Sequence, residues 1–292
     1  MLTFDFVGPQ PTRPAAVAGT WYPERPADLV QAIDGYFARV DTTLPGEIVG
    51  LVAPHAGLVY SGPVAAHAYR QLSGRSYDVI VLVGPSHYAG FDGVAVYARG
   101  AFETPLGRIP IAEDIASAIV RDVEVARDLA GPHGREHSLE MQLPFLQSVL
   151  PGTPIVPMLM GRQTPAVMAA LGDGLAPVLA GRRALAVASS DLSHYHDART
   201  AARLDRVVIE AIARFDPEGL AQALELFPEH ACGGGPMVAV MRVARALGAR
   251  SARVLCYADS GDVSGDKDAV VGYAAAVLGT FDEPPAPPEA PS

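Results

Sequence analysis

The pattern of apolar and polar residues along the chain predicts strands that alternate with helices. Short apolar runs bounded by Gly, Pro or Ser are typical of strands buried on both faces. Strands are expected at residues 48–53, 79–83, 93–97, 154–159, 184–188, 253–258 and 270–277. Helical spacing predicts helices at residues 27–39, 62–72, 111–121, 138–150, 164–179, 198–213, 216–226 and 236–247. This alternation favours an α/β fold, with a largely parallel central sheet flanked by helices.

The same pattern indicates one domain. No Pro/Gly/Ser linker and no repeat at a fixed period divides the chain, so residues 13–281 are expected to fold together. Residues 1–12 are expected to be a loose N-terminal segment. The tail at residues 282–292 is rich in proline and acidic residues and cannot bury apolar area, so it is expected to be disordered.

Composition excludes several classes of protein. The 292 residues are 49% hydrophobic and 18% charged, which is enough for a large core. A net charge of −10 without any basic cluster argues against a nucleic-acid partner. No apolar stretch reaches the roughly 20 residues of a membrane span, and the N-terminus lacks the pattern of a signal peptide. Two cysteines do not make a disulfide framework. We therefore expect a cytoplasmic protein without a membrane partner.

Three of the predicted strands end in a histidine. The motif Pro-His places His55 after the first run, Gly-Pro-Ser-His places His87 after the second, and Ser-Ser-Asp-Leu-Ser-His places His194 after the run at 184–188. Ligands of open α/β sheets bind at the carboxyl ends of the strands, where these loops meet. Three imidazoles at that edge predict a metal site or an acid/base site.

Cys232 lies in a glycine-rich loop before a predicted helix. Gly233, Gly234 and Gly235 allow the backbone to approach a ligand, and their N–H groups can form a nest for an anion. The helix N-terminus is expected to favour the thiolate, so Cys232 is a candidate metal ligand or nucleophile. The alternative is a small buried apolar residue, which is the interpretation we favour for Cys256, inside a predicted strand.

Further polar residues lie near these loops. Asp191 and His194 share one loop and can form an oriented general base, although the Gly-x-Ser-x-Gly motif of many serine hydrolases is missing. His137 either faces the same edge or belongs to a helix-entry cluster. Tyr257 leaves a predicted strand and either lines the pocket or belongs to an acidic turn.

Seven motifs together resemble the Memo family, whose prokaryotic members are called AmmeMemoRadiSam system protein B. The motifs, in order, are RPAAVAGTWYP (13–23), PHAG (54–57), GPSH (84–87), EHSLEMQLPF (136–145), SSDLSH (189–194), CGGGP (232–236) and SGD (260–262). The resemblance implies a fold similar to the class III extradiol dioxygenases, which use non-haem Fe(II). It implies His55, His87 and Cys232 as metal ligands. It also implies His194 as a catalytic base with Asp191 beside it, and His137 as a second catalytic histidine.

The resemblance leaves three functions to weigh. The first is a metal-dependent redox enzyme with Fe(II), in which the thiolate ligand also makes copper or zinc credible. The second is a binding module that recognises a phosphorylated or other anionic ligand, or a partner protein, in the same pocket. The third is a metal-assisted hydrolase in which Asp191 and His194 activate water. The family label also suggests AMMECR-type and radical S-adenosylmethionine proteins as pathway partners.

Overall fold

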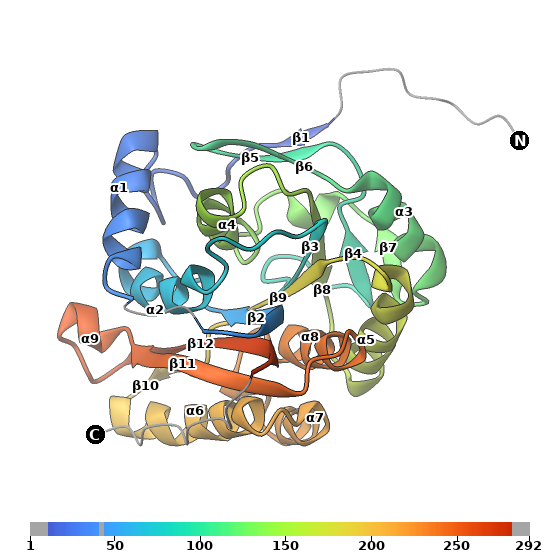
Figure 1. The fold of residues 1–292 in the computed structure, drawn as a ribbon. Helices are drawn as coiled ribbons and strands as arrows, with labels where there is room; N and C mark the ends of the chain where they lie inside the picture. Colours follow the sequence, from blue (N-terminus) through green and yellow to red (C-terminus); the bar gives the residue numbers. More distant parts are fainter. Residues whose placement is uncertain (1–10, 41–43, 282–292) are drawn as a thin grey trace, which may run out of the picture.

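The computed structural model describes residues 11–40 and 44–281, and its centre is a sheet between two layers of helices (Figure 1). The strand order is β10-β12-β2-β9-β3-β8-β4-β7, with β11 also paired to β12. The strands are β2 (Glu47–Ala53), β3 (Val79–Pro85), β4 (Val94–Val96), β7 (Ala126–Asp128), β8 (Ile155–Met160), β9 (Ala184–Ser189), β10 (His194–His196), β11 (Ser251–Asp259) and β12 (Val270–Thr280).

The middle of the sheet is parallel. Strands β2, β9, β3 and β8 run in one direction, and every residue of β3, β8 and β9 is buried. Complete burial is typical of parallel strands that helices cover on both faces, and it explains the unbroken apolar runs. Towards the edges, β12 is antiparallel to β2, and β4 is antiparallel to β8. The predicted α/β fold is confirmed.

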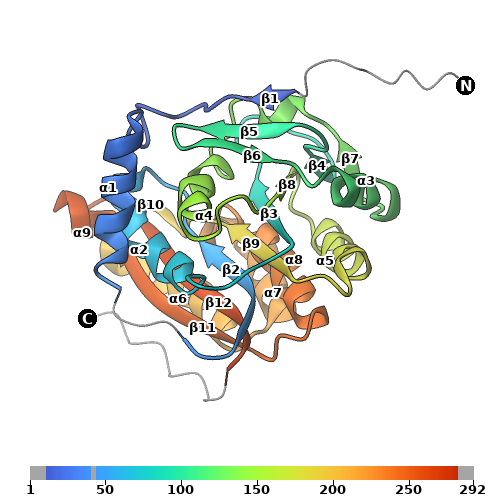
Figure 2. The ribbon, with the colours of Figure 1, turned by 45° about the horizontal axis from the view of Figure 1, so that its top comes forward.

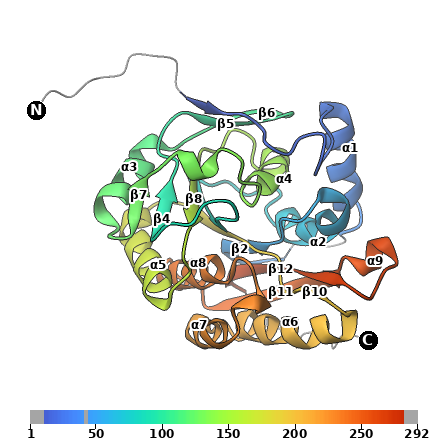
Figure 3. The ribbon, with the colours of Figure 1, turned by 180° about the vertical axis from the view of Figure 1, so that it is seen from behind.

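Helices cover both faces of the sheet (Figures 1 and 3). Helices α1, α2 and α4 pack together on one side, and α8 packs against β2, β3 and β9 on the other side with α5 and α7 against it. None of the helices in the described part of the chain is long and apolar enough to span a bilayer. The helices are α1 (Pro26–Phe37), α2 (Leu58–Arg70), α3 (Glu113–Asp122), α4 (Leu143–Val149), α5 (Pro165–Leu179), α6 (Ala198–Ala213), α7 (Pro217–Leu226), α8 (Gly234–Ala246) and α9 (Gly261–Ser264).

Two helix boundaries differ from the prediction for tertiary reasons. Helix α2 begins at Leu58 instead of residue 62, because the N–H of Leu58 donates to the backbone oxygen of Trp21 (2.8 Å). The segment at 138–150 opens with a 3₁₀ turn, η2 (Glu140–Gln142), and becomes α-helical only at Leu143. Its expected start is lost because the hydroxyl of Ser138 donates to the Pro85 oxygen (2.9 Å).

A second, small sheet was not predicted. It joins β1 (Thr12–Arg13), β5 (Ala101–Thr104) and β6 (Gly107–Pro110), which lie side by side in Figure 2. These strands are too short for a periodicity signal, and β1 pairs with a segment far away in sequence. Thr12, expected to be loose, is therefore paired. Residues 1–10 and the predicted disordered tail lie outside the described residues.

Candidate metal centre

His55 is buried at the carboxyl edge of the sheet, directly after β2. Its N–H donates to Oδ1 of Asp191 (2.7 Å), and its Nδ1 lies 2.8 Å from Oγ of Ser189, the last residue of β9. The pairing of β2 with β9 brings these strand ends together. Burial, with the nearby charges of His87 and His137, holds the pKa of His55 well below its ordinary value. The ring is therefore neutral, which is the form that binds a metal.

His87 follows β3 and is held by a buried carboxylate. Its N–H donates to Oε2 of Glu136 (2.6 Å), and its Nδ1 lies 2.9 Å from Oε1 of the same residue. Burial acts to raise the pKa of Glu136, but the hydrogen bonds and charge of His87 and the N–H of Ser138 lower it to about 2. Because a carboxylate only accepts, Nδ1 of His87 carries a hydrogen, which leaves Nε2 as the ring nitrogen that can bind a metal.

His137 completes a compact group of three imidazoles. Its ring stacks on His87, with centroids 4.5 Å apart and planes 17° from parallel. On its other contact, the centroid of the Trp21 ring lies 4.2 Å from the centroid of His137. Burial, with the charge of His87, lowers the pKa of His137 to about 4. Ligand nitrogens of His55, His87 and His137 all lie within 4.8 Å of one another, so the group can hold a metal ion.

Cys232 lies beside His55, next to this group. Its Sγ is 3.2 Å from Nε2 of His55 and 3.6 Å from the backbone oxygen of Asp191. Burial, with the charge of Asp191, raises the pKa of Cys232, contrary to the thiolate expected from the helix N-terminus. Burial also raises the pKa of Asp191 to about 7, against the effect of the N–H bonds it accepts. In the absence of a cation, Cys232 is therefore a thiol.

The glycine-rich loop packs tightly against the protein. The N–H of Gly233 donates to Oγ of Ser190 (2.9 Å), and the N–H of Gly235 donates to Oε1 of Gln163 (2.7 Å). The N–H of Gly234 bonds within the loop itself. All three groups of the expected anion nest thus have acceptors inside the protein. The loop instead places Cys232 at the sheet edge.

His194 lies in β10, half-buried. Its Nδ1 is 2.8 Å from the backbone oxygen of Leu192, so Nδ1 carries the hydrogen and Nε2 can accept a proton. Burial lowers the pKa of His194; the bond to Leu192 opposes this, and the charge of His87 adds to it. Tyr257 donates its hydroxyl to the buried Asp205 (2.8 Å).

Sequence reasoning missed three partners of the imidazoles: Glu136, Ser189 and Trp21. Glu136 directly precedes His137, so it was visible as a neighbour but not as the residue that holds His87. Ser189 ends a strand, and its role depends on the pairing of β9 with β2. Trp21 comes from a distant segment. Their positions follow from tertiary contacts that no local pattern encodes.

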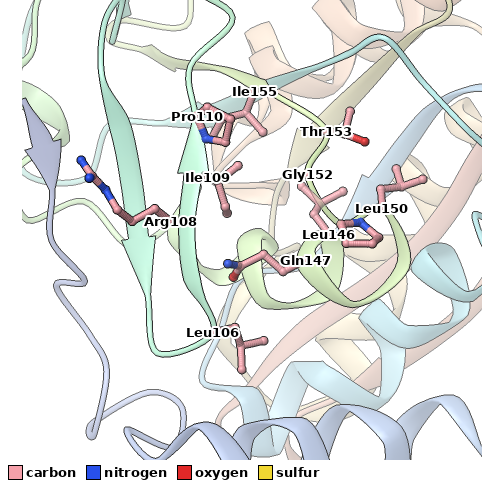
Figure 4. Close-up of a pocket in the computed structure, with 11 residues that line it drawn as sticks. Leu106, Arg108, Ile109, Pro110, Leu146, Gln147, Leu150, Gly152, Thr153 and Ile155 are labelled. Atoms are coloured by element: carbon pink, nitrogen blue, oxygen red, sulfur yellow. The ribbon is translucent and has the colours of Figure 1, made fainter. Parts of the chain in front are cut away.

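The remaining histidines lie outside the compact group. His133 is buried, with Nε2 3.1 Å from the Ala95 oxygen, as expected for a structural residue. His67 lies in α2, His196 in β10 and His230 in a 3₁₀ turn. A cavity of about 160 Å³ between β6 and α4 is also separate, with Arg108 as the charged residue of a largely apolar lining (Figure 4).

The fold and the imidazole group define the class of protein first: an α/β protein with a central, largely parallel sheet and, at the carboxyl edge of that sheet, three histidines that can hold a metal ion. The uncharacterized protein JW3007 from Escherichia coli K12 has a similar fold. Its TM-score is 0.53 at 15% identity, and the match covers 79% of this chain and all of that chain.

Sequence comparisons then identify the family. The family model described as Memo-like protein matches residues 13–277. MEMO1 family protein PAE0818 from Pyrobaculum aerophilum is 40% identical over 272 residues, covering 90% of this chain and 97% of the relative. A MEMO1 family protein from Methanosarcina mazei is 39% identical over 269 residues, covering 91% and 98%. The chain belongs to the Memo family, which confirms the resemblance.

Proposed function

We propose that this chain is a metal-dependent redox enzyme that acts on a small molecule, with its ion bound by His55, His87 and Cys232. The observation that carries the proposal is the convergence of ring nitrogens whose ligand atoms lie within 4.8 Å of one another. Nδ1 of His87 is committed to Glu136 and Nδ1 of His55 lies on Ser189, so each ring offers Nε2 as a ligand. His137 lies within the same group and is the alternative third ligand.

The donor set suits a transition metal. Nitrogen and sulfur ligands of one tetrahedral ion lie roughly 3.6 Å apart, given bond lengths of about 2.1 and 2.3 Å. The 3.2 Å between Nε2 of His55 and Sγ of Cys232 is close to that separation. Two imidazoles and one anionic ligand leave positions open for substrate, as in non-haem Fe(II) sites. We therefore propose Fe(II) as the ion, with copper and zinc as the other metals that a thiolate suits.

The chain's own residues would transfer protons and position the metal ligands. When bound, the ion would supply redox chemistry to a substrate at this edge of the sheet. His194 is the proposed base, because the bond from Nδ1 to Leu192 leaves Nε2 to accept a proton and its lowered pKa keeps the ring neutral at pH 7. The rings of Trp21 and His137 lie against each other at this site, with centroids 4.2 Å apart and planes tilted by 46°. Asp191 positions His55 through the backbone N–H.

Metal analysis of anaerobically purified protein tests the proposal. Wild type is compared with His55→Ala, His87→Ala, Cys232→Ser and His137→Ala, and with His67→Ala as a control from α2. We expect stoichiometric metal in wild type and the control, and loss in the His55 and His87 variants. Loss in Cys232→Ser with retention in His137→Ala supports the proposed third ligand. Equal metal content in all the proteins would refute the site.

A binding module for anionic ligands is the second candidate. The guanidinium of Arg135 lies 4.4 Å from the centroid of the Tyr88 ring, and the Tyr88 hydroxyl is 3.4 Å from Nδ1 of His137. This places a cation near the imidazoles. The module predicts ligand binding that survives EDTA, whereas the redox enzyme requires its metal.

A further inference from the structure

A buried chain of uncharged side chains leads away from His55. It runs from Tyr69 in α2 through Gln142 in η2 to Ser189 at the end of β9, and all three are fully buried. The three elements belong to three separate parts of the sequence. For each of these side chains, its other partners determine whether it donates or accepts. Together they therefore determine whether Nδ1 of His55 donates or accepts.

The amide of Gln142 has one possible orientation. Its Nε2 lies 3.0 Å from the backbone oxygen of Pro54, which can only accept, so the NH₂ group faces Pro54. The same NH₂ group donates to Oγ of Ser189 (2.8 Å). The amide oxygen on the other side accepts the hydroxyl of Tyr69 (2.6 Å).

The hydroxyl of Ser189 then has no hydrogen left for His55. Its Oγ lies 2.6 Å from the backbone oxygen of Ser138, and this carbonyl must receive the single hydroxyl hydrogen. Oγ already accepts one hydrogen bond from Gln142. Its remaining partner is Nδ1 of His55, 2.8 Å away, which must therefore be a donor.

We propose that Tyr69, Gln142 and Ser189 are positioning residues that fix His55 as the Nδ1–H tautomer, with the Nε2 lone pair directed towards Cys232. The tautomer is a property of the metal-free protein. Its consequence for metal affinity rests on the proposed function. The two histidines are thus oriented differently: His87 by the carboxylate of Glu136, and His55 by a neutral hydroxyl whose direction the Ser138 backbone oxygen and the Gln142 amide determine.

The tautomer is measured by long-range ¹H–¹⁵N correlation NMR on metal-free protein at pH 8. The zinc dissociation constant is measured separately by competition with a chelator. The variants are Ser189→Ala, which removes the acceptor, and Tyr69→Phe, which removes one of the hydrogen bonds that hold the Gln142 amide in its orientation. Tyr77→Phe is the matched control, because its hydroxyl donates to the backbone oxygen of Ile48 (2.9 Å), away from the site.

We expect wild type and Tyr77→Phe to show His55 with Nδ1 protonated only. Ser189→Ala should show both tautomers and bind zinc roughly 10-fold more weakly, and Tyr69→Phe should shift in the same direction to a smaller extent. If Ser189→Ala does not fold, the His55 tautomers of the wild type and of Tyr69→Phe test the proposal. An Nε2–H tautomer in wild type, or unchanged tautomers in both variants, overturns the proposal. An Nδ1–H tautomer in a wild type that binds no metal supports this proposal and refutes the metal site.

Discussion

Nδ1 of His87 and Oε1 of Glu136 lie 2.9 Å apart, and this bond ties the loop after β3 to the loop before η2. The carboxylate also accepts the N–H groups of His137 and Ser138, both at 2.9 Å. One buried side chain thus orients the ring of one imidazole and the backbone of another. Substitution of Glu136 therefore tests directly how the imidazoles of the candidate metal centre are held in position.

Glu136→Gln is expected to weaken metal binding. The amide presents one acceptor where the carboxylate presents two, and it removes the negative charge that makes His87 a better ligand. Loss of such a partner typically reduces metal affinity about 10–100-fold. The zinc dissociation constant is measured against a chelator, with the more exposed Glu210→Gln as the control. Equal affinities for wild type and Glu136→Gln would contradict the role assigned to this carboxylate.

Glu140→Gln is expected to destabilise the protein and loosen Trp21. Glu140 pairs with Arg13, and the two side chains are 0% and 2% exposed. It also accepts the hydroxyl of Tyr22 (2.6 Å). Removing one partner of a buried pair costs about 3–5 kcal/mol. Urea unfolding measures the loss, and fluorescence of Trp21, the single tryptophan, reports its contact with His137.

The control for Glu140→Gln is Asp122→Asn. It removes a pair with Arg121 in which both side chains are about half exposed or more, and such pairs contribute about 0–1 kcal/mol. A loss for Glu140→Gln no larger than for this control would show that the buried pair does not hold the segment.

Gly233→Ala is expected to disturb the loop that carries Cys232. A Cβ there would lie 2.3 Å from the backbone oxygen of Ser189, which cannot yield without moving β9. Gly35→Ala in α1 is the matched control, since its Cβ would meet nothing within 4 Å and the change should stabilise the helix by about 0.5–1 kcal/mol. Thermal unfolding should move the two variants in opposite directions. A Gly233→Ala protein as stable as wild type would show that the loop has room.

Stability is expected to fall between pH 6.5 and pH 4 because of His133. Burial lowers its pKa from 6.5 to about 4, and among the described residues its Nδ1 has no hydrogen-bond partner. Below pH 6.5 the unfolded chain takes up a proton that the folded protein does not. The stabilisation, complete above pH 6.5, is therefore lost as the pH falls to about 4, a change of about 3 kcal/mol.

The measurement is the free energy of unfolding at pH 7.5 and at pH 4.5, for wild type and for His133→Gln. The other buried histidines titrate in both proteins, so the difference between the two isolates His133. A pH dependence that is the same in both would assign the effect to the imidazole cluster instead.

Local patterns predicted the strands that form the parallel centre because each is a continuous apolar run, and complete burial of β3, β8 and β9 leaves no polar position to interrupt it. The start of the helix expected at residues 216–226 was also predicted correctly: Asp216 is the N-cap of α7 and accepts the N–H of Gly219 (2.9 Å). By contrast, β1, β5 and β10 were missed. They are short, and they are stabilised by pairing with strands that are remote in sequence more than by the strand propensity of their own residues.

The sequence by itself determined which chemistry is available and where on the sheet it lies. Strand ends deliver His55 and His87 to one edge, because parallel strands finish on the same side. Only the tertiary structure decided how these groups act together. His137 stacks on His87, and the thiol of Cys232 lies beside His55. The glycine N–H groups donate to acceptors within the protein. The reason is physical: a hydrogen bond or a burial shift depends on distances between segments that are remote in sequence, and those distances exist only in the folded chain.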